Sequence, residues 1–142
     1  MKLVLLVEDS RFLRVANARA LQKAGYSVVT ANDGEEALRI AWARLPDLIV
    51  LDMLLPKLGG PEVLHALKNN PKTNFIPVII LSSLPQKNEL TLRKEGAAAY
   101  FEKSKLELDN NPESFVHFVK RMMDGVTEPA GQESPARSQQ IS

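Results

Sequence analysis

Short, nearly continuous apolar runs alternate along the chain with segments whose apolar residues have helical spacing. The run at residues 2–7 is almost entirely apolar, as expected for a strand buried on both faces of a parallel sheet. Ser10 can cap a helix start, and Gly25 supplies a helix stop. Between them, apolar residues recur at helical spacing: Leu13, Ala16, Ala20, Leu21 and Ala24. This first stretch therefore predicts a strand followed by a helix.

The same alternation of a strand pattern and a helix pattern recurs four more times. The predicted strands cover residues 27–30, 48–51, 77–81 and 98–101, and the predicted helices cover residues 35–44, 61–67 and 85–95, with a last helix beginning at 111–113. Gly34, Pro61 and Gly96 lie at the boundaries and support these limits. Five strands that alternate with helices through short links predict a doubly wound, five-stranded parallel α/β sheet with helices on both faces.

Chain length and composition bound the domain organisation. At 142 residues, with 44% apolar and 25% charged residues, the chain has room for one domain of ordinary size. We expect this domain to span residues 1–124. Residues 125–142 are rich in Gly, Pro, Ser and Gln and show no apolar period, which predicts a disordered tail or the stub of a linker.

Charge and cysteine content exclude several classes of function. Eighteen basic and seventeen acidic residues give a formal charge of +1, so no strong field is available to hold nucleic acid directly. The absence of cysteine excludes disulfides, thiolate metal sites and thiol nucleophiles. The apolar start at residues 3–7 is too short for a signal-peptide core or a membrane span. We therefore expect a cytoplasmic protein with no membrane partner.

Residues with acidic, hydroxyl or amino groups follow four of the five predicted strands. Glu8 and Asp9 follow the first strand, Asp52 the third, Ser82 the fourth and Lys103 the fifth. Ligands of such sheets bind outside the carboxyl ends of the strands, so we expect these side chains to converge at one edge. Three carboxylates held close together repel one another, and a hard divalent cation such as Mg²⁺ relieves that repulsion.

This set of groups suits phosphoryl transfer onto a carboxylate. Because Mg²⁺ needs only one or two carboxylates besides phosphate oxygens, Asp52 remains able to act as a nucleophile toward phosphorus. Lys103 and Ser82 supply an ammonium and a hydroxyl for the phosphoryl oxygens. The Gly59-Gly60 loop beyond Asp52 offers backbone carbonyls to the metal, and Leu54 is the nearest candidate.

Each of these residues, taken alone, has a more ordinary interpretation. Asp9 and Ser10 can simply cap the first helix, an aspartate such as Asp52 often forms a turn, and a surface lysine such as Lys103 is usually only solvated. The functional interpretation rests on the joint occurrence of these groups at the ends of strands one, three, four and five. A random α/β domain would seldom produce that combination.

Over about residues 2–124 the sequence resembles the receiver domains of two-component response regulators. Four segments carry the resemblance: 7–10 (VEDS), 48–56 (LIVLDMLLP), 78–83 (VIILSS) and 96–103 (GAAAYFEK). The resemblance implies a flavodoxin-like fold with strand order 2-1-3-4-5. It also implies a role for each residue of the site: phosphoacceptor for Asp52, acidic metal pair for Glu8 and Asp9, switch hydroxyl for Ser82, coupled aromatic for Tyr100, and phosphoryl-binding lysine for Lys103.

The sequence departs from the family pattern at two places. The family usually has Lys-Pro with a cis peptide bond where this chain has Lys103-Ser104, and a cis bond before serine would cost about 3–4 kcal/mol. We therefore expect a trans bond there. The turn after the phosphoacceptor usually contains Asp-Gly and here reads Gly59-Gly60 followed by Pro61, a change that the site should survive.

The resemblance implies a signalling switch that catalyses its own phosphorylation and slow dephosphorylation rather than a metabolic enzyme. The expected phosphodonor is a sensor histidine kinase or a phosphotransfer protein. Because the sequence contains no output domain, we expect a stand-alone regulator whose signal leaves through protein contacts. The expected contact surface is that of the fourth helix, the fifth strand and the last helix, and a homodimer is also possible.

Three other functions fit the sequence less well. An aspartyl-phosphate phosphatase requires a second aspartate two residues after the nucleophile, where this chain has Leu54. A receiver-like domain that only binds proteins would have no need of the acids, hydroxyl and lysine that are present here. A flavin carrier would need a phosphate-binding loop rich in Ser, Thr and Gly after the first strand, and this loop is absent.

Overall fold

The computed structural model describes residues 1–82, 89–102 and 113–125. These residues form one five-stranded sheet whose strands are β1 (Leu3–Val7), β2 (Ser27–Ala31), β3 (Leu48–Asp52), β4 (Val78–Ser82) and β5 (Ala99–Glu102). Every strand pair is parallel, and the order across the sheet is β2-β1-β3-β4-β5. The predicted fold class and strand order are thereby confirmed.

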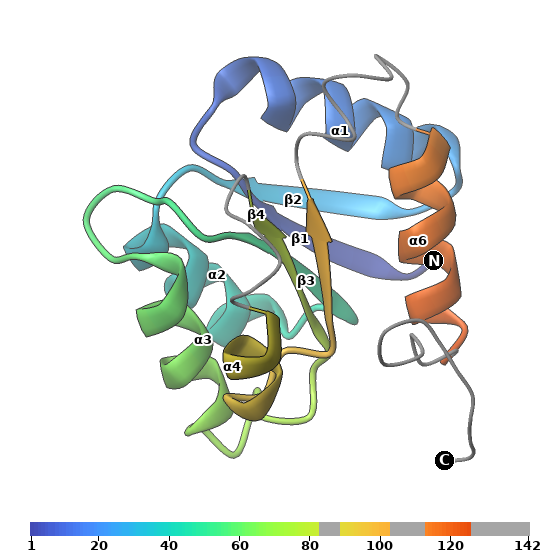
Figure 1. Cartoon of the computed structure of the whole chain (residues 1–142). Coiled ribbons are helices and arrows are strands. Elements are labelled where there is room, and N and C mark those ends of the chain that lie inside the picture. Colours follow the sequence, from blue (N-terminus) through green and yellow to red (C-terminus); the bar gives the residue numbers. More distant parts are fainter. Residues whose placement is uncertain (83–88, 103–112, 126–142) are drawn as a thin grey trace.

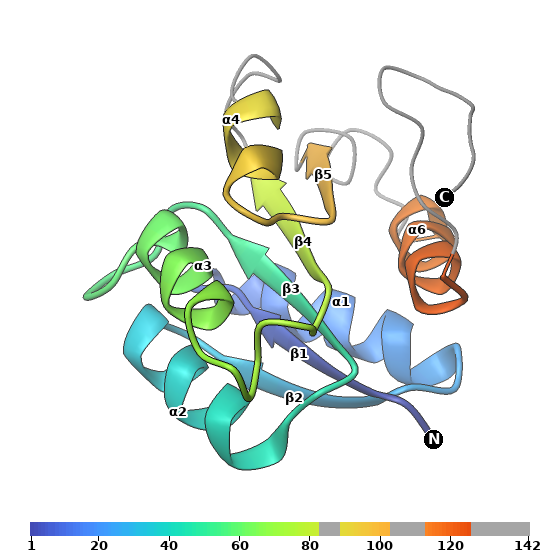
Figure 2. The ribbon, with the colours of Figure 1, turned by 90° about the horizontal axis from the view of Figure 1, so that it is seen from below.

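Helices cover both faces of the sheet (Figure 1). They are α1 (Arg11–Lys23), α2 (Gly34–Arg44), α3 (Gly60–Lys68), α4 (Glu89–Lys94) and α6 (Glu113–Met123). Figure 2 shows α1 and α6 on one face and α2, α3 and α4 on the other. The predicted helix starts at Pro85 and Asn111 lie outside the described residues.

Local capping residues explain where the first two helices begin. The hydroxyl of Ser10 accepts a hydrogen bond from the Leu13 amide at 3.4 Å and caps α1 as predicted. Asp33 caps α2 in the same way, because its Oδ1 accepts from the Glu36 amide at 2.8 Å. Each cap satisfies an amide that the helix itself leaves unpaired. The first turns of α1 and α2 are therefore fixed close to the ends of β1 and β2.

Two hydrophobic cores lie on opposite faces of the sheet. One packs the sheet against α2 and α3, and the other packs it against α1 and α6. Phe115 of α6 is fully buried and meets Phe101 of β5 edge to face, with ring centroids 5.9 Å apart. Burial of such a side chain contributes about 1.5–3 kcal/mol to the free energy of unfolding. β1, β3 and β4 therefore lie between the two cores, which pack against them from both faces.

Among the described residues, no helix combines the length and the hydropathy needed to cross a bilayer.

Candidate functional site

Three carboxylates meet at the carboxyl edge of the sheet. Glu8 and Asp9 follow β1 directly, and Asp52 is the last residue of β3, which lies beside β1. The register pairs Val7 with Leu51, so the two chains reach this edge together. One carboxylate oxygen from each acid lies within 4.8 Å of the other two. The expected convergence of the three acids is therefore observed.

The three acids differ in their exposure to solvent. Glu8 and Asp52 are buried, with 0% and 2% of their surfaces exposed, whereas Asp9 is exposed. Backbone amides orient the two buried groups: Ser10 donates to Oε2 of Glu8 at 3.0 Å, and Leu54 donates to Oδ1 of Asp52 at 3.2 Å. The positive end of α1 begins just beyond Glu8 and also favours negative charge. A buried pair of acids beside an exposed third acid is an arrangement that a hard cation would stabilise.

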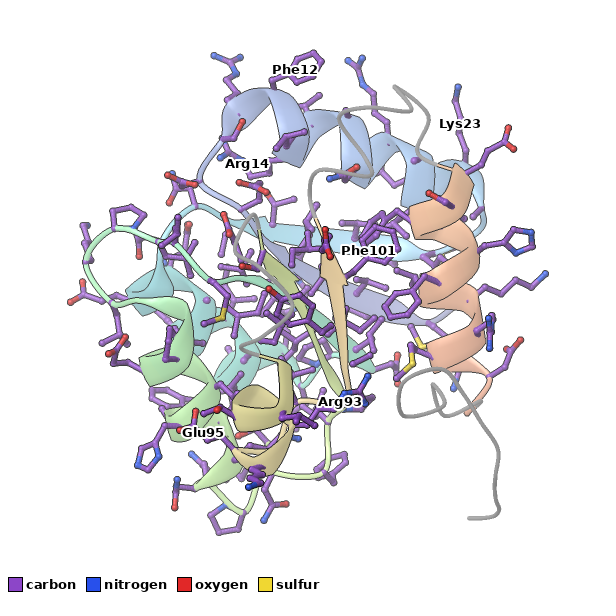
Figure 3. The ribbon with its side chains drawn as sticks, viewed as in Figure 1. Phe12, Arg14, Lys23, Arg93, Glu95 and Phe101 are labelled. Carbon is purple, nitrogen blue, oxygen red and sulfur yellow. The ribbon has the colours of Figure 1, made fainter. Side chains whose placement is uncertain are left out.

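The structure adds Arg14 to the residues that shape the site. Its guanidinium donates to the backbone carbonyl of Glu8 at 2.9 Å and to that of Asp9 at 3.3 Å. Arg14 points from α1 toward the strand ends (Figure 3). This contact fixes the backbone that carries both acids and leaves their carboxylates to other partners. The only sequence signal was a basic residue one turn inside α1, which is too common a feature to be diagnostic.

The loop that follows Asp52 folds back toward the end of β3. The amide of Gly60 donates to the carbonyl of Met53 at 3.0 Å. A Cβ atom at Gly60 would lie 2.6 Å from both the Asp52 carbonyl oxygen and the Met53 Cα, so only glycine fits this approach. Leu54, expected to offer a carbonyl to the metal, lies in this loop, and 59% of its surface is exposed.

Ser82 lies on β4, which is next to β3, and Tyr100 lies on β5, the strand beyond β4. Ser82 is the last residue of β4 and is buried, one position beyond Leu81, the register partner of Asp52. Tyr100 pairs with Ile80 across β4 and β5, and 7% of its surface is exposed. The tyrosine ring therefore already belongs to the core against α2 and α3. A movement of Tyr100 toward the interior on activation would have to start from a more exposed state than this one.

Two of the sequence-based expectations for the site fall outside the described residues: the position of Lys103 and the conformation of the Lys103-Ser104 bond.

Comparison with known proteins agrees with the fold. The profile of the response regulator receiver domain family matches residues 4–109, and the chain belongs to this family. Receiver domains of this family are phosphoacceptor switches of two-component signalling rather than metabolic enzymes. They interact with histidine kinases or phosphotransfer proteins and with downstream targets.

The curated relatives include regulators that this chain covers to different extents. The chain is 41% identical over 103 residues to the alkaline phosphatase synthesis transcriptional regulatory protein PhoP of Bacillus subtilis, a match that covers 72% of this chain and 42% of that protein. It is 34% identical over 103 residues to the polar-differentiation response regulator DivK of Brucella anthropi, covering 72% of this chain and 84% of DivK. The chain thus spans less than half of the first of these relatives.

Solved receiver structures superpose on most of the chain. The chemotaxis response regulator CheY4 of Vibrio cholerae has a TM-score of 0.77 and 31% identity, covering 85% of this chain and 98% of CheY4. The response regulator TrrA of Thermotoga maritima, solved in complex with Mg²⁺-BeF, has a TM-score of 0.73 and 30% identity, with the same coverage of each chain.

Proposed function

We propose that Asp52 is the residue of this receiver domain that accepts the phosphoryl group. The observation that carries the proposal is the cluster formed by Glu8, Asp9 and Asp52, in which one oxygen of each acid lies within 4.8 Å of the others. Asp52 ends the central strand β3 and is oriented by the Leu54 amide. Its position and its hydrogen bond from the Leu54 amide suit an attacking carboxylate, since a nucleophile gains from being held in place.

The donor set of the cluster fits a magnesium ion. Carboxylate oxygens are the ligands that Mg²⁺ prefers, and the cluster offers oxygens from Glu8, Asp9 and Asp52, to which the Leu54 carbonyl can be added. When bound, the metal supplies positive charge that neutralises the phosphoryl oxygens during transfer. Asp9 is exposed and gives the ion a route from solvent, whereas buried Glu8 would act through its negative charge. The complex of TrrA with Mg²⁺-BeF supports this assignment.

The proposed reaction transfers one phosphoryl group between two proteins. The bond between phosphorus and the donor histidine nitrogen breaks, and a bond between phosphorus and a carboxylate oxygen of Asp52 forms. The histidine nitrogen leaves with the electron pair of the broken bond. Ser82 would then donate its hydroxyl proton in a hydrogen bond to a phosphoryl oxygen, and Lys103 would supply an ammonium to another. The domain thus catalyses its own phosphorylation and, more slowly, its own dephosphorylation.

We further propose a cytoplasmic protein that receives the group from a sensor histidine kinase or a phosphotransfer protein. Residues 1–124 would form the receiver domain, and residues 125–142 a tail or linker stub. A downstream protein, or a second copy of this chain, would bind the phosphorylated domain at the surface of α4, β5 and α6. Tyr100 and Ser82 would couple that surface to the phosphoryl group, because Ser82 ends β4 beside the site and Tyr100 lies on the adjacent strand β5, which belongs to this surface.

Incubation with a small acyl phosphate and Mg²⁺, followed by intact mass measurement, tests the proposal. We expect the wild-type protein to gain one phosphoryl group. Asp52→Asn, which preserves shape but removes the nucleophile, and wild-type protein with EDTA should gain none. Asp47→Asn is the matched control, because Asp47 binds the Leu3 amide at the opposite edge of the sheet and should still be labelled.

Labelling of Asp52→Asn to the wild-type level would place the acceptor at another residue. Full labelling in EDTA would show that the acid cluster does not act through a metal.

A further inference from the structure

The loop that follows Asp52 is held at both of its ends by close backbone contacts. At its start, Leu54 donates to the Asp52 carboxylate; directly after its last residue, Gly60 packs against the backbone of Asp52 and Met53. At its far end, the loop meets the first turn of α2. A Cβ atom added to Gly34 would lie 2.7 Å from the Cβ of Leu58 and 2.8 Å from its carbonyl carbon. Real Cβ atoms essentially never approach other heavy atoms within 3.0 Å, so glycine is required at Gly34 for this contact.

A second contact joins the same two segments. Asp33 caps α2 through Oδ1, while its Oδ2 lies 3.7 Å from the ammonium of Lys57 in the loop. Lys57 has a φ of 67°, a left-handed conformation that costs energy for a residue with a side chain. The loop therefore keeps an unfavourable backbone conformation at the point where it contacts α2. Such strain persists only where surrounding contacts determine the conformation.

The start of α2 is itself tied to the acid cluster. The amide of Glu8 donates to the carbonyl of Ala31 at the end of β2, at 3.0 Å. The amide of Asn32 then donates to the Glu36 carboxylate at 2.9 Å, which holds the turn between β2 and α2. The first turn of α2 is thus fixed to the end of β1, where the acids lie. It bridges this fixed edge and the loop that carries Leu54.

We propose that the first turn of α2, through Gly34, is a positioning element that sets the loop of residues 53–59 for metal binding. This inference rests on the proposed function and extends it to residues that do not touch the site. A displacement of Leu58 would also move Pro56, because the Leu58 amide donates to the Pro56 carbonyl at 2.7 Å. Pro56 lies two residues from Leu54, whose carbonyl is the proposed ligand. Mg²⁺ requires nearly ideal octahedral geometry, so it tolerates a displaced ligand poorly.

The test measures Mg²⁺ affinity without phosphorylation, from the amide signals of Met53 and Leu54 in an NMR titration with MgCl₂. Replacement Gly34→Ala should weaken Mg²⁺ binding by about tenfold or more, the effect expected of a residue that supports a metal ligand. Trp42, the only tryptophan, lines a surface hollow together with Leu58, so its indole signal reports independently on the loop.

Ala37→Gly serves as the matched control. It lowers the helical stability of α2 and leaves the contact of Gly34 with Leu58 in place. This variant should bind Mg²⁺ within about twofold of wild type, since it displaces no ligand.

The outcomes separate this inference from the proposed function. If wild-type signals of Met53 and Leu54 do not respond to Mg²⁺, the metal centre and the inference both fail. If wild type binds Mg²⁺ and Gly34→Ala binds it equally well, the inference alone fails. Equal weakening in Gly34→Ala and Ala37→Gly would also refute it, because stability and not placement would then be the cause.

If Gly34→Ala fails to fold, the NMR titration of the wild-type protein with MgCl₂ tests the inference instead. The amide signals of Gly34 and Leu58 should then move with the same midpoint as that of Leu54. Unchanged signals at Gly34 and Leu58 would overturn the inference.

Discussion

Replacement of Leu54 by asparagine should accelerate loss of the phosphoryl group from Asp52. Hydrolysis requires a water molecule aligned with the phosphorus–oxygen bond of phosphorylated Asp52. Leu54 lies two residues after this acceptor and has no side-chain hydrogen-bonding group with which to hold such a water. Its backbone amide is fixed to the Asp52 carboxylate at 3.2 Å, so a polar side chain introduced here would start close to the reacting group.

The expected magnitude follows from the exposure of the side chain. Because 59% of the Leu54 surface is exposed, an asparagine enters without creating a cavity, and the free energy of unfolding should change by no more than about 0.5 kcal/mol. One hydrogen bond that holds the attacking water is worth about 1.4 kcal/mol of the barrier, which corresponds to about a tenfold faster reaction. Leu54→Met keeps an apolar side chain of similar size and should decay at the wild-type rate.

The assay follows phosphorylated protein by intact mass after removal of the donor at a fixed Mg²⁺ concentration. Wild type and Leu54→Met should decay slowly and alike, and Leu54→Asn about ten times faster. Equal decay of all three proteins would mean that water reaches phosphorylated Asp52 by a route that Leu54 does not control. Faster decay of Leu54→Met would show that coverage by the leucine, rather than water positioning, sets the lifetime.

Two further predictions concern the switch and the pH dependence of stability. Ser82→Ala should still be phosphorylated, but amide exchange of Tyr100 should respond less than in wild type; an equal response would remove Ser82 from the coupling. Burial, followed by the nearby charge of Asp124, raises the pKa of Tyr26 above its usual value of 10.0. The folded state then keeps the phenol proton where the unfolded state loses it, so stability should fall as the pH rises above about 10. In denaturant titrations Tyr26→Phe should reduce this fall, and an identical profile would contradict the assignment.

Most of the fold follows from local sequence patterns. The alternation of apolar runs with helical spacing defined five strands and the helices between them, because the periods of strands and helices differ and are visible within a few residues. The cap at Ser10 was predicted for the same reason, since its hydrogen-bond partner Leu13 is three positions away. The predicted strand limits differ from the observed ones by at most one residue, as at β2, which continues to Ala31.

The location of the acids at strand ends was also a property of the sequence. Glu8 and Asp52 each follow an apolar run directly, Asp9 follows Glu8, and the carboxyl ends of parallel strands necessarily share an edge. Their approach to within 4.8 Å needed one further condition, that β1 and β3 be neighbours in the sheet. That condition came from the resemblance to receiver domains and not from the apolar pattern.

Contacts between segments far apart in the chain were decided by the tertiary structure alone. Nothing in the local pattern indicated that Gly34 would meet the backbone of Leu58, or that Tyr100 would be buried in the core against α2 and α3. The physical reason is that periodicity and capping depend on neighbours within one turn or one strand. Contacts such as that of Gly34 with Leu58 depend instead on how helices pack onto the sheet and on the path of each loop.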